Sequence, residues 1–460
     1  MTPPRAMAKA VGEATNGFHG RCAYTSMGLT LTAERGNPIK PVRVLVWADA
    51  MPATNELAAL FPGFTNAYNF WMPSRAVAES TGSNSFRIGY NPPAIVAAED
   101  YLKWSDDFAD DFDLIREAMK RPYAQLEGDY SSPAGVPVPN FICQRVMAQM
   151  LTDRAKCHLL LGQPQAALED LTMVRGLCRV MEGQQGRPVT LVATMIDVAV
   201  TGIYVDAIAE GMRLKAWRDP ELAALQEQLK QINLVPMLSG SFEYERASSC
   251  HLLESIKPDE YLKTVAAFGT LPKTNLWDKL ENVTYLILQV GPRGWVYQNM
   301  SRVALLEGKL LECLDTTNRL VSPGKAGTKS EEMQAALHRV SPYNYLAVDL
   351  VPNFTRAVQV LAQNQCMADE ALVACALERR RLAHGEYPKT LEVLAPEFLE
   401  KIPRDIISGQ PLKYHLKHGG QFALYSVGWN ERDDGGVPGR EKDGTQDGKK
   451  GDWVWAGSIR

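Results

Sequence analysis

Helical periodicity dominates the middle of this 460-residue chain, from about residue 94 to residue 365. The best-marked helix has Asp219 as its N-cap and Pro220 at its first helical position, and it ends before Pro236. Its apolar residues share one stripe: Leu222, Leu225, Leu229 and Ile232. Comparable periods run through residues 141–161, 164–181, 191–209 and 295–314. No strand pattern alternates with these helices, so we expect a mainly α protein, a helical bundle or irregular α-solenoid, without a parallel sheet.

One turn within this region resembles the inter-helix turn of a tetratricopeptide unit. It reads Leu161-Gly162-Gln163-Pro164-Gln165-Ala166-Ala167, with Leu171 one turn later. Since no second copy follows one repeat period away, a single helical hairpin is favoured over a repeat array. A second glycine-containing segment, residues 324–330, lacks the spacing of a phosphate-binding loop, and we interpret it as a solvated linker.

The most apolar stretch, residues 189–209, is interrupted by Asp197, Gly202 and Asp206. Two carboxylates would be costly to desolvate inside a bilayer, so we expect a buried bundle helix. Residues 1–20 contain Arg5 and Lys9 but no apolar run that would suit a signal peptide or anchor. We therefore expect a cytoplasmic protein if this N-terminus is native, and membrane association only if an anchor is missing from it.

Length and composition constrain the domains and partners. The chain is longer than one core usually serves, so we expect two or three domains: an irregular region over 1–93 with one strand-like run at 42–47, a helical domain over 94–365, and a unit over 369–460. A formal charge of -4 offers no broad basic surface, and we expect no nucleic-acid partner. Eight widely spaced cysteines show no zinc pattern and are interpreted as buried small hydrophobes.

The sequence changes character from Asp369 onward. A helix with a basic run near its C-terminal end stops at Gly385, which suits a left-handed cap, and Pro388 prevents its continuation. A short helix is expected around 390–394, followed by alternating strands over 412–416 and 422–427. A loop rich in Gly and Asp follows. We expect residues 369–455 to form one compact α+β unit.

Four ordered landmarks in this unit resemble the major pseudopilins of type II secretion. They are the helix end His384-Gly385-Glu386-Tyr387-Pro388, then Pro403-Arg404-Asp405, Gly409-Gln410-Pro411-Leu412-Lys413-Tyr414 and Leu424-Tyr425-Ser426-Val427-Gly428. The resemblance covers under a quarter of the chain and implies a pseudopilin-like α+β module. A pseudopilin has an apolar N-terminal helix directly before this module, whereas here a long helical region precedes it. We therefore do not expect a filament subunit.

The whole chain also resembles large bacterial proteins of no known activity that carry this module behind a helical domain. Segments 121–123, 217–219 and 345–355 contribute to that likeness. Some of these relatives begin with a membrane anchor. The resemblance implies a periplasmic or cell-envelope location and a protein partner.

The pseudopilin resemblance also implies a calcium ion in the loop that follows the Leu-Tyr-Ser strand. The corresponding carboxylates here are Asp433, Asp434, Asp443 and Asp447. Clustered carboxylates with glycine-permitted turns suit a hard cation. Interspersed Lys and Arg residues and the absence of a regular calcium-loop spacing leave a solvated polar loop as the alternative.

No catalytic motif is recognisable. The chain has no Gly-x-Ser-x-Gly elbow, His-Glu-x-x-His pair or Gly-x-Gly-x-x-Gly turn, and its seven histidines are scattered. Glu243 and Glu245 could form an acid/base pair only with a partner supplied by folding. The preferred hypothesis is a non-enzymatic interaction or scaffold protein. The alternative is an envelope enzyme with a carboxylate-based site in the helical domain.

Overall fold

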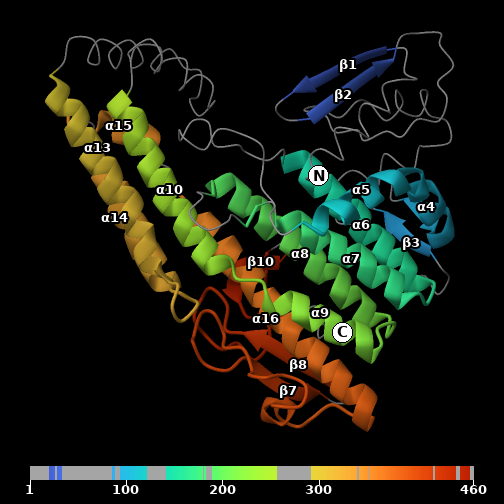
Figure 1. Cartoon of the computed structure of the whole chain (residues 1–460). Helices are drawn as coiled ribbons and strands as arrows, with labels where there is room; N and C mark the ends of the chain where they lie inside the picture. Colours follow the sequence, from blue (N-terminus) through green and yellow to red (C-terminus); the bar gives the residue numbers. More distant parts are fainter. Residues whose placement is uncertain are drawn as a thin grey trace.

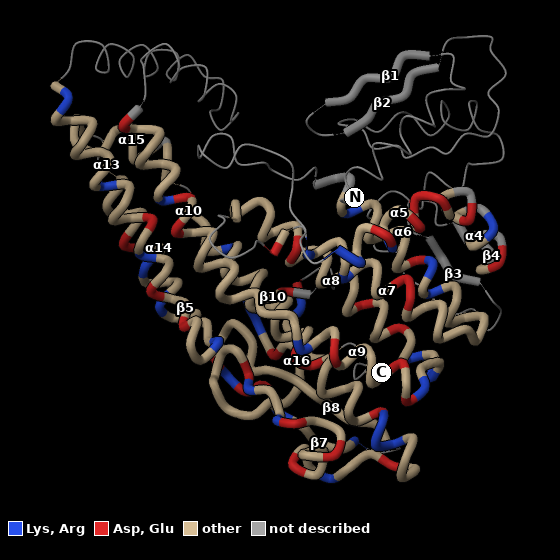
Figure 2. The backbone as a smooth tube through the Cα atoms, in the orientation of Figure 1, with Lys and Arg blue, Asp and Glu red and all other residues tan. Residues whose placement is uncertain are grey.

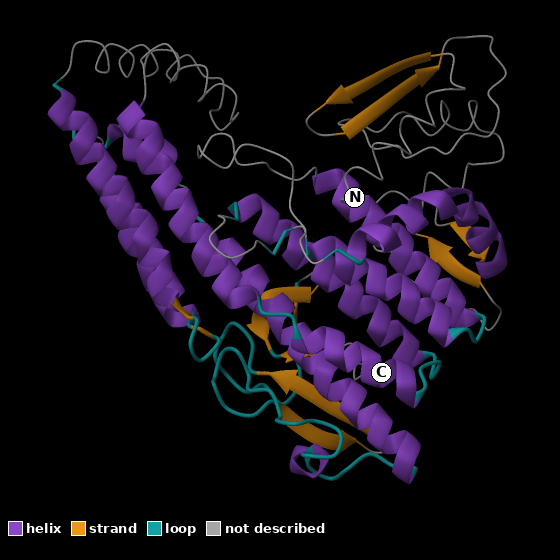
Figure 3. Ribbon diagram, viewed as in Figure 1, coloured by secondary structure: helices purple, strands orange, loops and turns teal. Residues whose placement is uncertain are grey.

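The structure is a computed structural model of the whole chain (Figure 1). It describes residues 20–25, 28–33, 85–88, 94–121, 141–179, 181–182, 189–255, 292–338, 341–351, 353–417, 420–441 and 446–455. Helices predominate in this part of the chain, and the C-terminal region adds a small sheet (Figure 3). The expected mainly α character is therefore confirmed.

Two antiparallel strand pairs lie in the described part of the N-terminal region, which we expected to be irregular. Strand β1 (Gly20–Thr25) pairs with β2 (Gly28–Ala33), and β3 (Ser85–Ile88) pairs with β4 (Ala94–Ala97). The strand-like run at 42–47 lies outside the described residues.

The helical body is built from helices that pack mainly on their sequence neighbours and on one long C-terminal helix. Its helices are α4 (Ala98–Ser105), α5 (Ala109–Met119), α6 (Phe141–Leu160), α7 (Pro164–Cys178), α8 (Leu191–Arg213), α9 (Asp219–Lys230), α10 (Leu234–Ser255), α13 (Arg293–Gly308), α14 (Pro323–Leu337), α15 (Tyr345–Leu350) and α16 (Thr355–His384). A one-turn 3-10 helix, η1 (Asp106–Phe108), joins α4 to α5, and η3 (Lys309–Cys313) follows α13. The periods predicted from the sequence therefore correspond to helices, with ends displaced by a few residues.

Helix α9 ends before Pro236, as predicted, but Ile232 of the predicted stripe lies beyond its end and its N-cap is one residue earlier than expected. Arg218 occupies the N-cap, so Asp219 is the first helical residue and its carboxylate is available for contacts elsewhere. Pro236 does not end a helix, because α9 has already stopped at Lys230. Pro236 lies in the first turn of α10, where a missing N–H leaves no helical hydrogen bond unmade.

Helix α8 is the core helix of the body. It is the one described helix long and apolar enough to cross a membrane, yet 67% of its most apolar window is buried inside the protein. Thr190 caps it by accepting a hydrogen bond from the Ala193 N–H at 3.2 Å. It packs against α6, α7, α10 and α16. This environment agrees with the expected buried bundle helix.

The segment over 324–330, interpreted above as a linker, forms part of α14. Ser322 is the N-cap and accepts from the Lys325 N–H, and Pro323 occupies the first turn. Lys329 then forms ion pairs with Glu312 at 2.9 Å and with Glu332 at 3.5 Å. These start signals and tertiary contacts outweigh the low helix propensity of the two glycines.

The C-terminal unit packs a three-stranded sheet against α16. Strand β7 (Lys413–Lys417) pairs antiparallel with β8 (Gln421–Ser426), which also pairs with β11 (Trp453–Val454). The pairing of the two predicted strands is therefore confirmed. Helix α16 contacts both β8 and β11. The boundary that we placed between 365 and 369 falls inside this continuous helix.

The two faces of β8 are covered differently. Leu424 is fully buried, and by strand alternation it faces away from its neighbour Tyr425. The Tyr425 hydroxyl donates to Asp433 at 3.1 Å, and its ring lies against Gly436, so the long loop covers this face. Gly428 has a left-handed φ of 68°, and a Cβ there would meet the carbonyl of Gly451, so the loop can close only over a glycine.

Gly385 ends α16 as predicted, with a φ of 85° and an N–H that donates to the Arg381 carbonyl at 2.8 Å. A 3-10 turn, η4 (Leu391–Leu394), occupies the place of the expected short helix. Lys and Arg are interspersed with Asp and Glu over the described backbone (Figure 2).

Candidate functional site

A cavity of about 370 Å³ lies in the helical body, between the end of α7, the first turns of α8 and the connection from α9 to α10. Its polar lining consists of Arg175, Glu182, Asp197, Gln231 and Asn233. Its apolar lining includes Leu234 and Met237 from the first turns of α10, among others. A mixed lining of this kind is typical of small-molecule sites.

Asp197 is the most perturbed group in this cavity. Its carboxylate is buried, and Oδ1 has no hydrogen-bond partner among the described residues. Burial raises the pKa of Asp197 to about 7, and the positive charge of Arg175 only partly offsets this. Near neutral pH the carboxyl can therefore exchange a proton, as a general acid or base must.

The second carboxylate in the cavity is already paired. Glu182 accepts from Arg175 Nη2 at 2.7 Å. The thiol of Cys178, close to Asp197, is buried, and burial raises its pKa well above the ordinary value, so no thiolate nucleophile forms there. The cavity thus holds one proton-exchanging carboxyl beside a neutralised ion pair.

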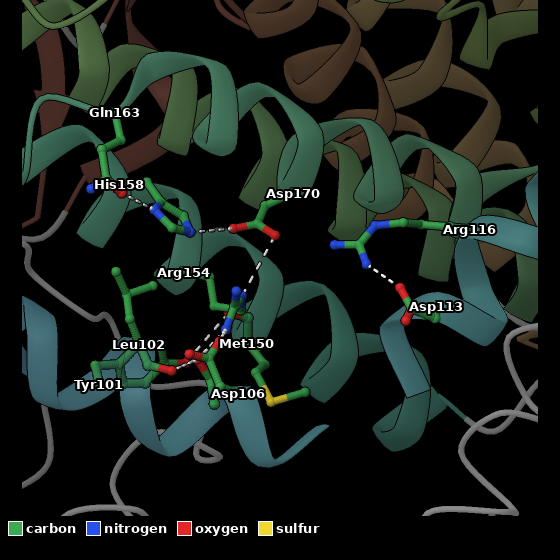
Figure 4. Close-up of polar contacts among 11 residues, drawn as sticks. Tyr101, Leu102, Asp106, Asp113, Arg116, Met150, Arg154, His158, Gln163 and Asp170 are labelled. Atoms are coloured by element: carbon green, nitrogen blue, oxygen red, sulfur yellow. Dashed lines mark hydrogen bonds and ion pairs between the residues drawn. The ribbon is translucent and has the colours of Figure 1, made fainter. Parts of the chain in front are cut away.

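A second polar cluster joins η1, α5, α6 and α7 (Figure 4). Asp170 of α7 lies 3.6 Å from Arg154 Nε and 3.7 Å from His158 Nε2. Arg154 Nη1 donates to Asp106 at 3.0 Å, and its guanidinium lies over the Phe112 ring at 5.0 Å. This cluster therefore ties the α6–α7 hairpin to the preceding helices.

Burial in this cluster favours the neutral forms of Asp170 and His158. Burial raises the pKa of Asp170 to about 7 and lowers the pKa of His158. His158 Nδ1 lies 2.8 Å from Gln163 Oε1, an acceptor that requires the proton on Nδ1 and leaves Nε2, which faces Asp170, without a proton (Figure 4). These contacts hold neighbouring helices together, so we assign the cluster a structural role.

No protein-family model matches this chain, and no curated protein or solved structure matches it.

The described carboxylates of the predicted calcium loop bond to separate partners. Asp433 forms an ion pair with Lys413 at 3.2 Å, Asp434 accepts from Asn430 Nδ2 at 2.8 Å, and Asp447 forms an ion pair with Lys450 at 2.6 Å. Within the described residues, no group of three or more potential metal ligands is found. Asp443 lies outside the described residues. Calcium binding therefore stays a prediction.

The carboxylate of Asp452 binds backbone N–H groups of this loop. Its carboxylate accepts from the N–H groups of Asp434 at 3.1 Å and Gly436 at 2.6 Å. The loop carboxylates that the structure describes are thus used to fold the loop.

Other residues singled out in the sequence are placed as follows. Glu245 accepts from the Leu191 N–H at 2.9 Å, whereas Glu243 is exposed, so the two carboxylates do not converge. The six cysteines whose side chains are described are free, and five of them are buried, as expected.

Sequence reasoning missed the role of Asp197, which it noted only as an interruption of an apolar stretch. The available signal was its position inside an otherwise apolar helical stretch, because a carboxylate on a buried helix must find a partner or keep its proton.

Proposed function

We propose that this protein is a non-enzymatic scaffold of the bacterial cell envelope, in which a pseudopilin-like module is held rigidly on a helical body and presented to a protein partner. The observation that carries the proposal is the continuity of α16. Its buried residues extend from Val358 to Glu378, so neither half of the helix has a solvent-exposed hinge. The helix contacts α8, α9, α10 and α14 of the body and also strands β8 and β11 of the sheet.

Helix α9 adds a second connection between the body and the module. Arg379 of α16 donates from Nε to Asp219 at 2.8 Å and from Nη1 to Gln226 at 2.8 Å. Gln226 Nε2 in turn donates to the Phe398 carbonyl at 3.0 Å, and the Arg379 guanidinium lies 5.8 Å from the Phe398 ring centre. Rigid presentation of this kind lowers the entropy that is lost when a partner docks.

The surface proposed for docking is the end of the module around the C-terminus of α16. Three exposed apolar side chains lie in its segments: Leu382, Val393 and Leu416. The ring centres of Tyr387 and Phe422 are 4.9 Å apart, and this contact joins the end of α16 to the sheet. The pseudopilin resemblance suggests a pseudopilin-type protein as the partner.

The test is photo-cross-linking in bacterial cells that express the full chain. A photoreactive residue at position 382 or 416 should yield one discrete heavier product containing a pseudopilin-type protein. The matched control places the same residue at position 331, an exposed site on α14, and should yield none. Equal products from all three positions, or none from positions 382 and 416, would refute docking at the module.

A second function is favoured by one observation, the proton-exchanging carboxyl of Asp197 in the cavity wall. Under this alternative, the protein is an envelope enzyme with Asp197 as general acid or base. A panel of fluorogenic esters and glycosides should then reveal turnover that changes between pH 6 and pH 8. Asp197→Asn should abolish it, whereas Asp113→Asn, at an exposed site on α5, should not. The absence of turnover on the whole panel would favour the scaffold.

A further inference from the structure

A second cavity, of about 290 Å³, lies where the helical body meets the C-terminal module. Four segments line it: the end of α9, the turn between β5 (Leu314–Asp315) and β6 (Leu320–Val321), the middle of α16, and residues 401–404. These segments are far apart in the sequence, so the cavity exists only in the folded chain.

The base of this cavity is apolar. Leu229, Ile232 and Leu372 contribute buried side chains, and Ile402 and Pro403 extend the apolar lining toward the module. An apolar base of this kind favours a ligand with a hydrocarbon or aromatic body, because its burial releases water from both surfaces.

Four cationic side chains line the same cavity, namely Lys230, Arg319, Lys401 and Arg404. Its one lining carboxylate, Asp369, is buried and already accepts from Arg319 Nη2 and Gln365 Nε2, both at 3.3 Å. Within the described part of the chain, Lys401 and Arg404 have no carboxylate at ion-pair distance. Lys230 is paired with Glu227 at 2.6 Å, so Lys401 and Arg404 supply the positive charge that no described carboxylate neutralises.

Arg319 is placed over the cavity by an unusual backbone conformation. Its φ is 56°, in the left-handed region that favours glycine. Asp315 fixes the preceding turn by accepting from the N–H groups of Thr317 at 3.1 Å and Asn318 at 2.9 Å. The Nε atom of Arg319 is buried and has no hydrogen-bond partner among the described residues. A long cationic side chain at a position suited to glycine points to a role for its guanidinium.

We infer that this cavity binds a small organic anion, a carboxylate or phosphate monoester on an apolar body, through Arg319, Lys401 and Arg404. The planar guanidinium groups match the oxygens of either head group. This site is separate from the proposed docking surface. Because its walls come from both the body and the module, a bound anion stabilises the junction between them.

Isothermal titration of the full chain with phenyl phosphate and with benzoate tests the inference. At least one of these probes should bind, and benzyl alcohol, which has the same ring without charge, should not. Inorganic phosphate should bind at least about tenfold more weakly than phenyl phosphate, since it cannot use the apolar base. Equal binding of benzyl alcohol and the anions, or no binding of either anion, overturns the inference.

The double variant Lys401→Gln with Arg404→Gln should weaken binding of the anionic probe by about tenfold or more. Both side chains are exposed, so the variant should fold, which circular dichroism checks. The matched control is Lys389→Gln, an exposed lysine of the same module outside the cavity, and it should bind as the unmodified chain does. Unchanged binding in the double variant, or an equal loss in the control, rejects the site.

Discussion

The carboxylate of Asp405 accepts a hydrogen bond from the Ser426 hydroxyl at 2.7 Å. This contact joins two of the landmarks that support the pseudopilin resemblance, the turn before β7 and the end of β8. The same carboxylate accepts from the N–H groups of Ile407 at 3.0 Å and Val427 at 3.4 Å, and from the Ser408 hydroxyl at 2.8 Å. A single buried acceptor thus organises the centre of the module.

Asp405→Ala should destabilise the module by about 3 kcal/mol, because several buried donors lose a charged acceptor together. Hydrogen exchange of the β8 amides reports this directly, and their protection should fall. Ser408→Ala is the control. It removes one partly exposed hydroxyl and should cost about 1 kcal/mol or less. Equal protection in the two variants would show that Asp405 does not organise the module.

Two helical glycines should respond oppositely to alanine. A Cβ on Gly211 of α8 would meet the buried indole of Trp217, whose Nε1 donates to the Ile208 carbonyl at 3.0 Å. Gly211→Ala should therefore cost about 2 kcal/mol through overpacking. Gly240 of α10 has open space around it, so Gly240→Ala should stabilise by about 0.5–1 kcal/mol through helix propensity. Urea denaturation measures both changes, and two shifts of the same sign would contradict the packing at Gly211.

The buried carboxyl of Asp197 should make stability depend on pH. Its pKa is raised from 3.8 to about 7, so between these values the unfolded chain releases a proton that the folded chain keeps. The contribution of this carboxyl to the free energy of unfolding is therefore highest below about pH 4. It falls as the pH rises to about 7 and stays low above that. The full loss is up to about 4 kcal/mol.

Asp197→Asn should remove this loss, so its gain in stability relative to the unmodified chain should be largest at pH 8, smaller at pH 5 and absent near pH 3. Melting temperatures at these pH values measure the difference. Asp113→Asn, at an exposed site, should leave the pH dependence unchanged. Parallel pH profiles for the Asp197 variant and the unmodified chain would show that this carboxyl is not kept protonated by burial.

The pseudopilin resemblance predicts that calcium raises the melting temperature by mass action on the folded state. Asp443→Ala should abolish the rise. Asp433→Ala should also lose an ion pair with Lys413, so it destabilises the module even without calcium. An equal rise with magnesium would identify a nonspecific effect of charge. No rise with calcium would show that the loop does not bind this ion.

The sequence by itself determined the helices of the body and the strand pair of the module. A spacing of 3.6 or 2 residues, a proline in a first turn and a glycine such as Gly385 at a helix end are local signals. They act within a few residues, so they can be interpreted without knowing the rest of the fold. Residues 324–330 form a helix rather than the predicted linker because Ser322 caps it and Lys329 pairs with Glu312 of η3, and the second of these contacts exists only in the folded chain.

Only the tertiary structure decided what the buried charges do. Asp197 keeps its proton because other helices cover its side of α8, and the basic cavity forms because residues between 229 and 404 meet around α16. The length of α16 likewise joins body and module, which the change of composition at Asp369 suggested were separate. Burial and charge proximity depend on contacts between distant segments, and no local pattern specifies which segments will meet.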